Sequence, residues 1–143
     1  MHPAKQWHYE TLGKKAVEAL KRNDFGAVYV PDSAEACRTI LSMIPSGASI
    51  GFGSSMTVRA IGILEQLREG NYRLINPPWV EDSTAREDRN NLRRQAMVAD
   101  LFLTGSNSIT LDGKLVNTDA TGNRVAGMIF GPKRTILVAG VNK

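Results

Sequence analysis

The chain alternates short, strongly apolar runs with longer amphipathic segments, and this alternation restricts its fold more than any other feature. The run 99–105 (ADLFLTG) is the most hydrophobic, and the runs 48–53 (ASIGFG) and 134–140 (RTILVAG) are similar. Short apolar runs that end in glycine are typical of buried strands, whereas apolar residues at every third or fourth position indicate helices. Strands that alternate with helices form a mostly parallel sheet, because each parallel pair requires a crossover connection.

The remaining elements follow from the same patterns. Helices are expected at about 9–22, from Asp32 to about Ile44, at about 55–67, from Ser83 onwards and at about 122–130. Two further short strands are expected at 26–30 (GAVYV) and 71–76 (NYRLIN). The run 108–117 contains Asp112-Gly113, the strongest short signal for a β-hairpin. This order predicts a three-layer, Rossmann-like α/β fold with a mostly parallel sheet and one β-hairpin, and we expect residues 1–143 to form a single domain.

The net charge of +4 is mild, and the basic residues form no recognisable nucleic-acid-binding module. Much of the excess lies in one segment, where two acidic residues partly offset four arginines: Arg86, Glu87, Asp88, Arg89, Arg93 and Arg94. Such a mixture is typical of a solvated helix face. We therefore expect no nucleic-acid partner, while anionic metabolites remain compatible with the charge.

Cys37 is the single cysteine, which excludes an internal disulfide and a cysteine-ligated iron–sulfur cluster built by this chain alone. It falls on the apolar side of an expected helix, so we interpret it as a packing residue. The first ten residues (MHPAKQWHYE) lack the apolar core of a signal peptide, and no apolar run approaches the roughly 20 residues of a membrane span. The reducing cytoplasm is therefore the expected compartment, without a membrane partner.

The segment 51–57 (GFGSSMT) places small polar residues at the end of the strand expected at 48–53. In an open α/β sheet, ligands bind outside the carboxyl ends of the strands, and the free N–H groups of a following helix favour an anion. The candidate anion-binding residues here are Gly51, Gly53, Ser54, Ser55 and Thr57. A glycine-rich turn with a serine cap explains them equally well. The segment lacks the Gly-Lys-Ser/Thr of a P-loop and the third glycine of a dinucleotide fingerprint, so we expect no cofactor.

A second polar segment, TGSNS, follows the most hydrophobic strand. It supplies Thr104, Gly105, Ser106 and Asn107, which have the composition of a plain turn but can also donate into a cleft at the strand end. No cluster of His, Cys, Asp or Glu has metal-ligand spacing, so no metal site is expected.

A third segment concentrates polar residues at the start of a helix. Its candidate residues are Asn117, Asp119, Thr121, Gly122, Asn123 and Arg124. A helix cap and a turn account for about two of these groups. A cation in a first helical turn is disfavoured by the helix dipole, so we expect Arg124 to have a negative partner, either Asp119 or a bound anion. Asp119 is the only acidic residue in the three segments and is therefore the candidate catalytic base.

Residues 99–143 closely resemble the core signature of the LUD domain, the lactate-utilisation protein family, and residues 50–67 resemble that family's first glycine loop and helix. The family is similar in fold to the sugar-phosphate isomerase and CoA-transferase group of Rossmann-like proteins. The resemblance implies the same fold here and a ligand site built from the three polar segments. Family members often have glycine where Ala120 stands, and they usually continue past residue 143, so we expect this domain to be shortened at its C-terminal end.

The resemblance implies bacterial oxidation of lactate to pyruvate, in a complex whose other subunits carry iron–sulfur clusters. Because this sequence has no cysteine cluster, haem motif or dinucleotide fingerprint, we predict an accessory or ligand-binding component that holds a small carboxylate or phosphorylated metabolite. The alternative is a sugar-phosphate isomerase or CoA-transferase-like enzyme with Asp119 as base, although no glutamate lies in the three segments to serve acyl transfer. A scaffold with rigid polar loops is a third reading, and association between copies of the chain is left open.

Overall fold

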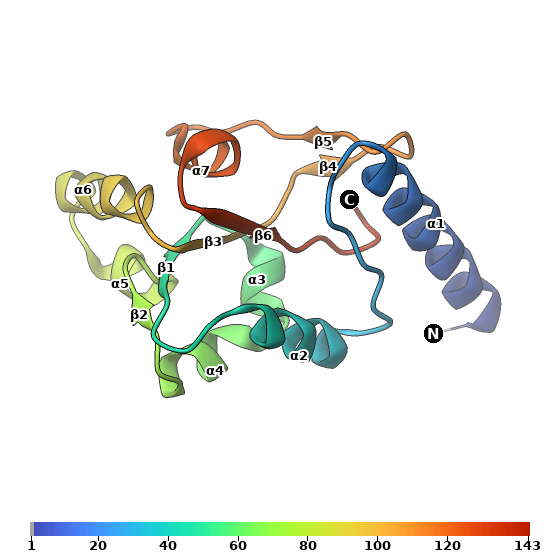
Figure 1. The fold of residues 1–143 in the computed structure, drawn as a ribbon, viewed down its shortest axis with the longest axis horizontal. Helices are drawn as coiled ribbons and strands as arrows, with labels where there is room; N and C mark the ends of the chain where they lie inside the picture. The colour runs from blue at the N-terminus through green and yellow to red at the C-terminus, as the bar shows by residue number, and fades with distance from the viewer. Residues whose placement is uncertain (1) are drawn as a thin grey trace.

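The structure is a computed structural model that describes residues 2–143. Four parallel strands form the main sheet in the order β2-β1-β3-β6 (Figure 1). Their bounds are β1 Ser49–Phe52, β2 Arg73–Leu74, β3 Leu101–Thr104 and β6 Arg134–Leu137. β3 lies between β1 and β6 and all its residues are buried, which confirms the buried strand predicted for the run 99–105 and gives it a central position.

Helices cover both faces of this sheet (Figure 1). One face carries α2 (Ser33–Met43), α3 (Met56–Ala60) and α4 (Ile63–Glu69), and the other carries α6 (Arg86–Ala96) and α7 (Asn123–Phe130). Side chains alternate along β3: Leu101 and Leu103 join the core cluster with α2, α3 and α4, whereas Phe102 packs against Gly127 of α7. The predicted three-layer α/β fold is therefore confirmed.

The predicted hairpin is present, but it forms a sheet of its own. β4 (Ser108–Ile109) pairs antiparallel with β5 (Leu115–Val116), and neither strand joins the main sheet. Gly113 in the turn has a φ of 85°, a conformation that residues with a Cβ rarely adopt. The Asp-Gly signal therefore identified the turn correctly.

The long helix α1 (Pro3–Arg22) stands beside the hairpin, apart from the main sheet (Figure 1). It begins earlier than the expected residue 9, and only Ala19 and Leu20 are buried, where the helix end meets Gly113. Asn23 fixes this contact by donating to the carbonyl oxygen of Gly113 at 2.9 Å. None of the helices within residues 2–143 is both long and apolar enough to span a membrane.

Two predictions in the first half of the chain are wrong. The segment 26–30 has no regular secondary structure and pairs with no strand among residues 2–143. Val28 remains 58% exposed, and the ring of Tyr29 lies against Gly13 of α1. A high content of β-branched and aromatic residues forms a strand only where a partner edge is free. The single helix expected at 55–67 breaks at Gly62, whose φ of 77° separates α3 from α4.

The region after β2 also differs from the prediction. The strand expected at 71–76 is reduced to the two residues of β2, and a short helix, α5 (Pro78–Ser83), follows it. Proline at the first helical position favours a helix start, because its fixed φ suits the helix and its missing N–H would have no partner there. No helix was expected between the strand at 71–76 and the helix from Ser83 onwards, although Pro78 stands at the first position of α5.

Candidate functional site

The three polar segments meet at the carboxyl ends of the parallel strands. A Cβ added at Gly53, directly after β1, would lie 2.9 Å from the Cβ of Thr104 and 3.3 Å from the Cγ of Arg124. A Cβ added at Gly105, directly after β3, would lie 2.5 Å from the Oγ of Ser55. The turns after β1 and β3 and the first turn of α7 are therefore in direct contact, at the edge where α/β proteins bind ligands.

Arg124 extends from the first turn of α7 into this edge, and it carries a charge that no carboxylate neutralises. Its Nη2 donates to the Oδ1 of Asn107 at 2.7 Å and to the carbonyl oxygen of Thr118 at 2.8 Å. Within residues 2–143, no carboxylate oxygen lies within 4.0 Å of its guanidinium nitrogens. Its Nε is buried and has no hydrogen-bond partner there. The cation thus remains uncompensated at the positive end of α7.

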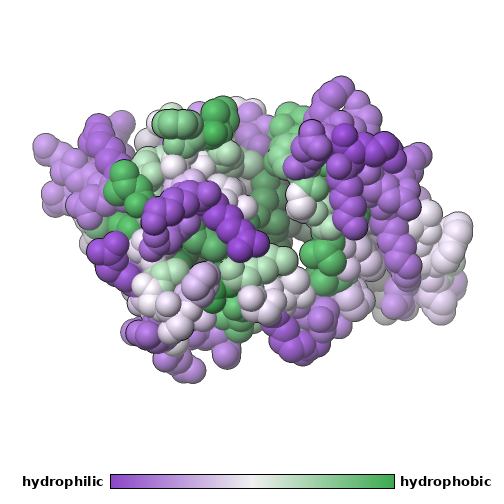
Figure 2. All heavy atoms as spheres, viewed as in Figure 1, coloured by the Kyte–Doolittle hydropathy of each residue, from purple (hydrophilic) through white to green (hydrophobic). Residues whose placement is uncertain are grey.

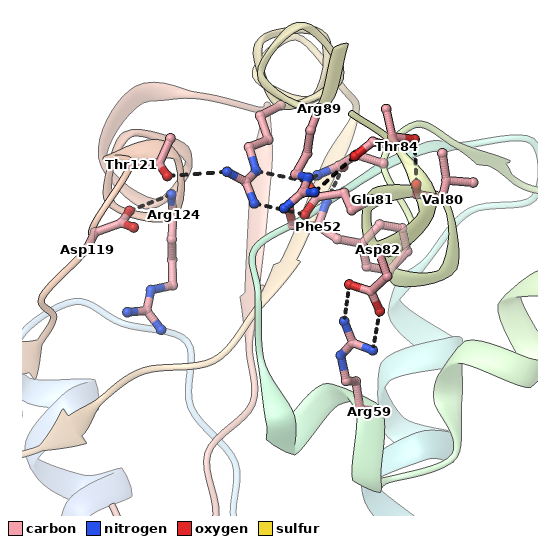
Figure 3. A network of polar contacts seen from close by, with 12 residues as sticks. Phe52, Arg59, Val80, Glu81, Asp82, Thr84, Arg89, Asp119, Thr121 and Arg124 are labelled. Carbon is pink, nitrogen blue, oxygen red and sulfur yellow. Dashed lines mark hydrogen bonds and ion pairs between the residues drawn. The ribbon is translucent and has the colours of Figure 1, made fainter. Parts of the chain in front are cut away.

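Asp119 caps α7 instead of pairing with this guanidinium. Its Oδ2 accepts the backbone N–H of Arg124 at 2.8 Å and that of Val125 at 3.1 Å (Figure 3). Burial alone would raise the pKa of Asp119, but the surrounding backbone N–H groups, including those of Gly122 and Thr121, outweigh it and hold the pKa below the usual value. Asp119 is therefore ionised near neutral pH and accepts a proton poorly.

The segment after β3 is tied to the segment before α7. The N–H of Asn107 donates to the Oδ1 of Asn117 at 3.3 Å, and the N–H of Thr118 donates to the Oδ1 of Asn107 at 2.9 Å. The hydroxyl of Ser106, a residue only 4% exposed, lies 3.0 Å from the carbonyl oxygen of Ser108 and 3.3 Å from the Oδ1 of Asn117, so either can accept its proton. Because Asn107 also accepts from Arg124, this set of bonds fixes the plane of the guanidinium.

Other predicted residues have identifiable structural contacts. Ser55 caps α3, since its Oγ accepts a backbone N–H of that helix at 3.2 Å. Thr104 is fully buried and donates to the carbonyl oxygen of Gly105 at 3.3 Å. Gly51 lies inside β1, where an added Cβ would lie 2.8 Å from the Cβ of Ala96, so this glycine faces α6 and not the loops.

Four predicted residues form no side-chain contact that joins the segments. Ser54 is exposed, while Thr57 and Asn123 are half-buried, and none of the three makes a side-chain hydrogen bond within residues 2–143. Gly122 immediately precedes α7 with a φ of 86°, a left-handed conformation that favours glycine. The close contacts therefore gather around Gly53, not around Ser54 or Asn123.

A polar network that sequence analysis missed joins the same edge to α5 and α6 (Figure 3). Asn76 is 1% exposed, and its Oδ1 accepts the N–H of Phe52 at 2.8 Å while its Nδ2 donates to Glu81 at 2.9 Å. Glu81 pairs with Arg93 at 3.1 Å, and Arg93 donates to the Oγ1 of Thr121 at 3.2 Å. Asn76 was detectable, because it lies two residues after β2, near the same strand ends as the polar segments that follow β1 and β3.

Arg89 lies one turn before Arg93 on α6 and resembles Arg124 in one respect. Its Nε is also buried without a hydrogen-bond partner in the described residues, and its Nη2 donates to the carbonyl oxygen of Thr84 at 2.9 Å. In Figure 3, however, Arg89 lies with Glu81 beneath α6, whereas Arg124 extends away from this group. Arg89 therefore belongs to the network of α5 and α6, whereas Arg124 belongs to the edge where the polar segments meet.

The surface has two hollows, and Arg124 lines neither of them. One is at the amino ends of the strands and is lined by residues 45–48 and by Asp100, Leu101 and Arg134. Asp100 there binds the Nζ of Lys133 at 2.7 Å and the N–H of Ser49 at 3.0 Å, and these contacts lower the pKa of Asp100. The other hollow lies along α7. The convergence of polar segments is therefore defined by their contacts and not by a deep cavity.

The chain is similar to a known protein family over most of its length. The family model described as the LUD domain matches residues 13–143, a range that includes the whole main sheet and all three polar segments. No curated protein and no solved structure matches the chain. Because the match covers well over half of the sequence, the chain belongs to the LUD-domain family.

Proposed function

We propose that this protein is an accessory, ligand-binding component of bacterial lactate utilisation that binds a small anionic metabolite, a carboxylate or a phosphate, at Arg124. Membership of the LUD-domain family supports the process. The observation that supports the site is the guanidinium of Arg124, which has no carboxylate partner within residues 2–143 and a buried Nε without an acceptor. The buried Nε is closed to a ligand, but the Nη1 of the same guanidinium has no hydrogen-bond partner within residues 2–143 and is not among the buried atoms, so an anion can reach the charge there.

The chemistry of arginine suits such a ligand. The guanidinium is planar, stays protonated at physiological pH, and presents donors in a fork that matches two oxygens of a carboxylate or phosphate. Asn107 and Thr118 hold the Nη2 of Arg124, so the orientation of the fork is set before a ligand arrives. The positive end of the α7 dipole would stabilise the same negative charge.

In this proposal the chain supplies binding, and partner subunits supply the electron acceptor. Oxidation of lactate to pyruvate releases two electrons, and a typical iron–sulfur cluster is held by four cysteine thiolates. The chain contains one cysteine, Cys37, which is half-buried on α2. The iron–sulfur subunits that the family resemblance implies are therefore the partners we propose, and the cytoplasm is the compartment that such a complex would share.

The alternative of an isomerase or a CoA-transferase-like enzyme with Asp119 as base has weaker support. The carboxylate of Asp119 is engaged by backbone N–H groups of α7, and its lowered pKa makes it a poor proton acceptor. The alternative stays a prediction that a substitution can test. Asparagine caps helices as well as aspartate does, so turnover of a sugar phosphate that disappears in Asp119→Asn would favour the enzyme.

Calorimetric titration with lactate, pyruvate and ribose 5-phosphate tests the proposed site. A charge-assisted hydrogen bond contributes about 1.5–3 kcal/mol, so Arg124→Ala should weaken binding about tenfold or more. Arg94→Ala is the matched control, because Arg94 is exposed on α6, bonds only to Asn91 of its own helix, and carries the same charge. No binding by the wild type, or an equal loss in both variants, would contradict a site at Arg124.

A further inference from the structure

The outer side of α7 is apolar and exposed, which is unusual for a helix that packs on a sheet with its other side. Phe130 is 94% exposed and Ile129 is 77% exposed, and both border a hollow that Met97, Val125 and Ala126 also line. Figure 2 shows hydrophobic atoms gathered at the outer surface over α7. Surface helices normally turn charged or polar side chains outward, whereas a helix that is apolar all round is normally covered. We call this surface the α7 face.

We propose that the α7 face binds the α7 face of a second copy of this chain, with the two α7 helices antiparallel across a twofold axis. In a twofold interface the same surface serves both copies, so each copy must present a projection and a matching depression. The α7 face has both, since the ring of Phe130 projects almost completely into solvent beside the hollow. The ring of each copy can thus enter the hollow of the other.

Charges at the two ends of the α7 face favour the antiparallel arrangement. Asp119 lines the hollow near the start of α7, and its lowered pKa keeps it negative. Lys133 lies two residues beyond Gly131 at the other end; its Nζ binds Asp100 of the same copy at 2.7 Å, and its side chain is still 79% exposed. An antiparallel pair brings Asp119 of one copy toward Lys133 of the other and sets opposite ends of the helix dipoles side by side. A parallel pair would place like charges together.

This inference does not rest on the anion site. The guanidinium of Arg124 is directed toward Asn107, away from the outer side of α7, so pairing needs no change there. An unrelated protein could cover the α7 face instead, and in that case the isolated chain would be monomeric. The state of association of the purified chain therefore decides between the two occupants.

Sedimentation equilibrium of the wild type and two variants provides the first test. We expect a wild-type mass twice that of one chain, and at least a tenfold weaker association in Phe130→Ser. Trp7→Ser is the matched control, since Trp7 is 67% exposed on α1, and it should associate as the wild type does. Both side chains are exposed, so circular dichroism should show unchanged folding. A wild type that is monomeric up to about 1 mM, or a dimer that Phe130→Ser leaves intact, would overturn the proposal.

Disulfide cross-linking provides the second test, because it locates the interface. Ala126 is exposed near the middle of α7, where an antiparallel pair brings the helices closest to the axis. Mild oxidation of a Cys37→Ser, Ala126→Cys variant should therefore give a covalent dimer, since a disulfide needs Cα atoms within about 7 Å. A Cys37→Ser, Gln6→Cys variant on α1 is the control. A dimer of the wild type without enhanced cross-linking at position 126 would place the interface elsewhere and refute the proposal.

Discussion

Replacing Gly53 with alanine tests the packing of the polar segments at its tightest point. The new Cβ would lie 2.9 Å from the Cβ of Thr104 and 3.3 Å from the Cγ of Arg124. Thr104 has no exposed surface and ends the central strand, so it has little room to move. The backbone of Gly53 is itself held, because its N–H donates to the carbonyl oxygen of Leu103 at 3.0 Å. The clash must therefore displace the strand end, the arginine or both.

We expect Gly53→Ala to lower the free energy of unfolding by about 1–3 kcal/mol, the usual range for overpacking. Gly53 is not among the glycines with positive φ, so steric contact and not backbone strain is the cause. For a chain of 143 residues this corresponds to a fall in Tm of roughly 3–10 °C. The same displacement should weaken anion binding, because it moves the side chain of Arg124.

Urea unfolding followed by circular dichroism measures this loss. Gly26→Ala is the matched control, because its Cβ would meet nothing within 4 Å and its φ is not positive, so it should be neutral or slightly stabilising. Thr104→Ala should lose part of its own cost in the Gly53→Ala background, because it removes the Oγ1, the atom nearest to the new Cβ, while the Cβ of residue 104 remains; a double-mutant cycle measures this coupling. Equal stability of the Gly53→Ala and Gly26→Ala proteins would refute the close approach.

Three further predictions concern stability. Asn76→Ala should cost about 2 kcal/mol or more in urea unfolding, because it leaves both backbone polar groups of Phe52 without their side-chain partner. Asp119→Ala should lower the free energy of unfolding by about 0.5–2 kcal/mol, because the helix cap is lost. The pKa of Asp119 is lowered from 3.8 in the folded state, so the wild type loses this stabilisation as the pH falls below 3.8. Thermal scans should therefore show the difference in Tm between wild type and variant shrinking below pH 3.8. Lys133 also lowers the pKa of Asp100, so the contribution of Asp100 to the free energy of unfolding is present above pH 3.8 and is lost on acidification. Asp100→Asn should therefore make the stability depend less on pH in this range.

The architecture could be predicted because its signals are local. The run 99–105 is apolar on both faces, as only a central strand between two helix layers requires. Asp32 predicted a helix start, and its Oδ1 accepts the N–H of Glu35 at 2.8 Å. Gly113 adopts the positive φ that the hairpin turn needs. Each of these residues performs its role through neighbours within a few positions, so the sequence contains the relevant information.

The failed predictions involve choices that only the tertiary fold makes. The segment 26–30 has the composition of a strand, but α1 packs beside it and no strand of the main sheet pairs with it. Gly62 was compatible with a continuous helix, and the positive φ that divides α3 from α4 has no signal in the flanking residues. Helix α5 is the exception, because Pro78 at its first position is a local signal for a helix start.

The candidate site was predicted as a set of segments but not as a set of contacts. The strand-end rule placed Gly53 and Arg124 at one edge, and the contact between them agrees with it. Which acceptor binds the guanidinium could not be deduced, because Asp119 was as eligible as Asn107 by composition. The backbone N–H groups of α7 and the guanidinium of Arg124 are alternative donors to Asp119, and in the fold Asp119 accepts from the backbone N–H groups. For the same reason, the sequence did not indicate that Arg93 donates a hydrogen bond to Thr121.

The most direct test of the proposed function is the NMR signal of the Nε–H group of Arg124, assigned with an Arg124→Lys variant, during titration with lactate and with inorganic phosphate. An anion bound at the accessible Nη1 changes the charge distribution of the whole guanidinium, so the proton and nitrogen shifts of its Nε–H group should change and saturate with at least one of these anions. Arg89 provides an internal control, because its Nε is also buried and unpartnered within residues 2–143 but lies in the α5–α6 network. Shifts at Arg124 without shifts at Arg89 are predicted. An Arg124 signal that stays unmoved, or that moves no more than the Arg89 signal, would contradict an anion site at this residue.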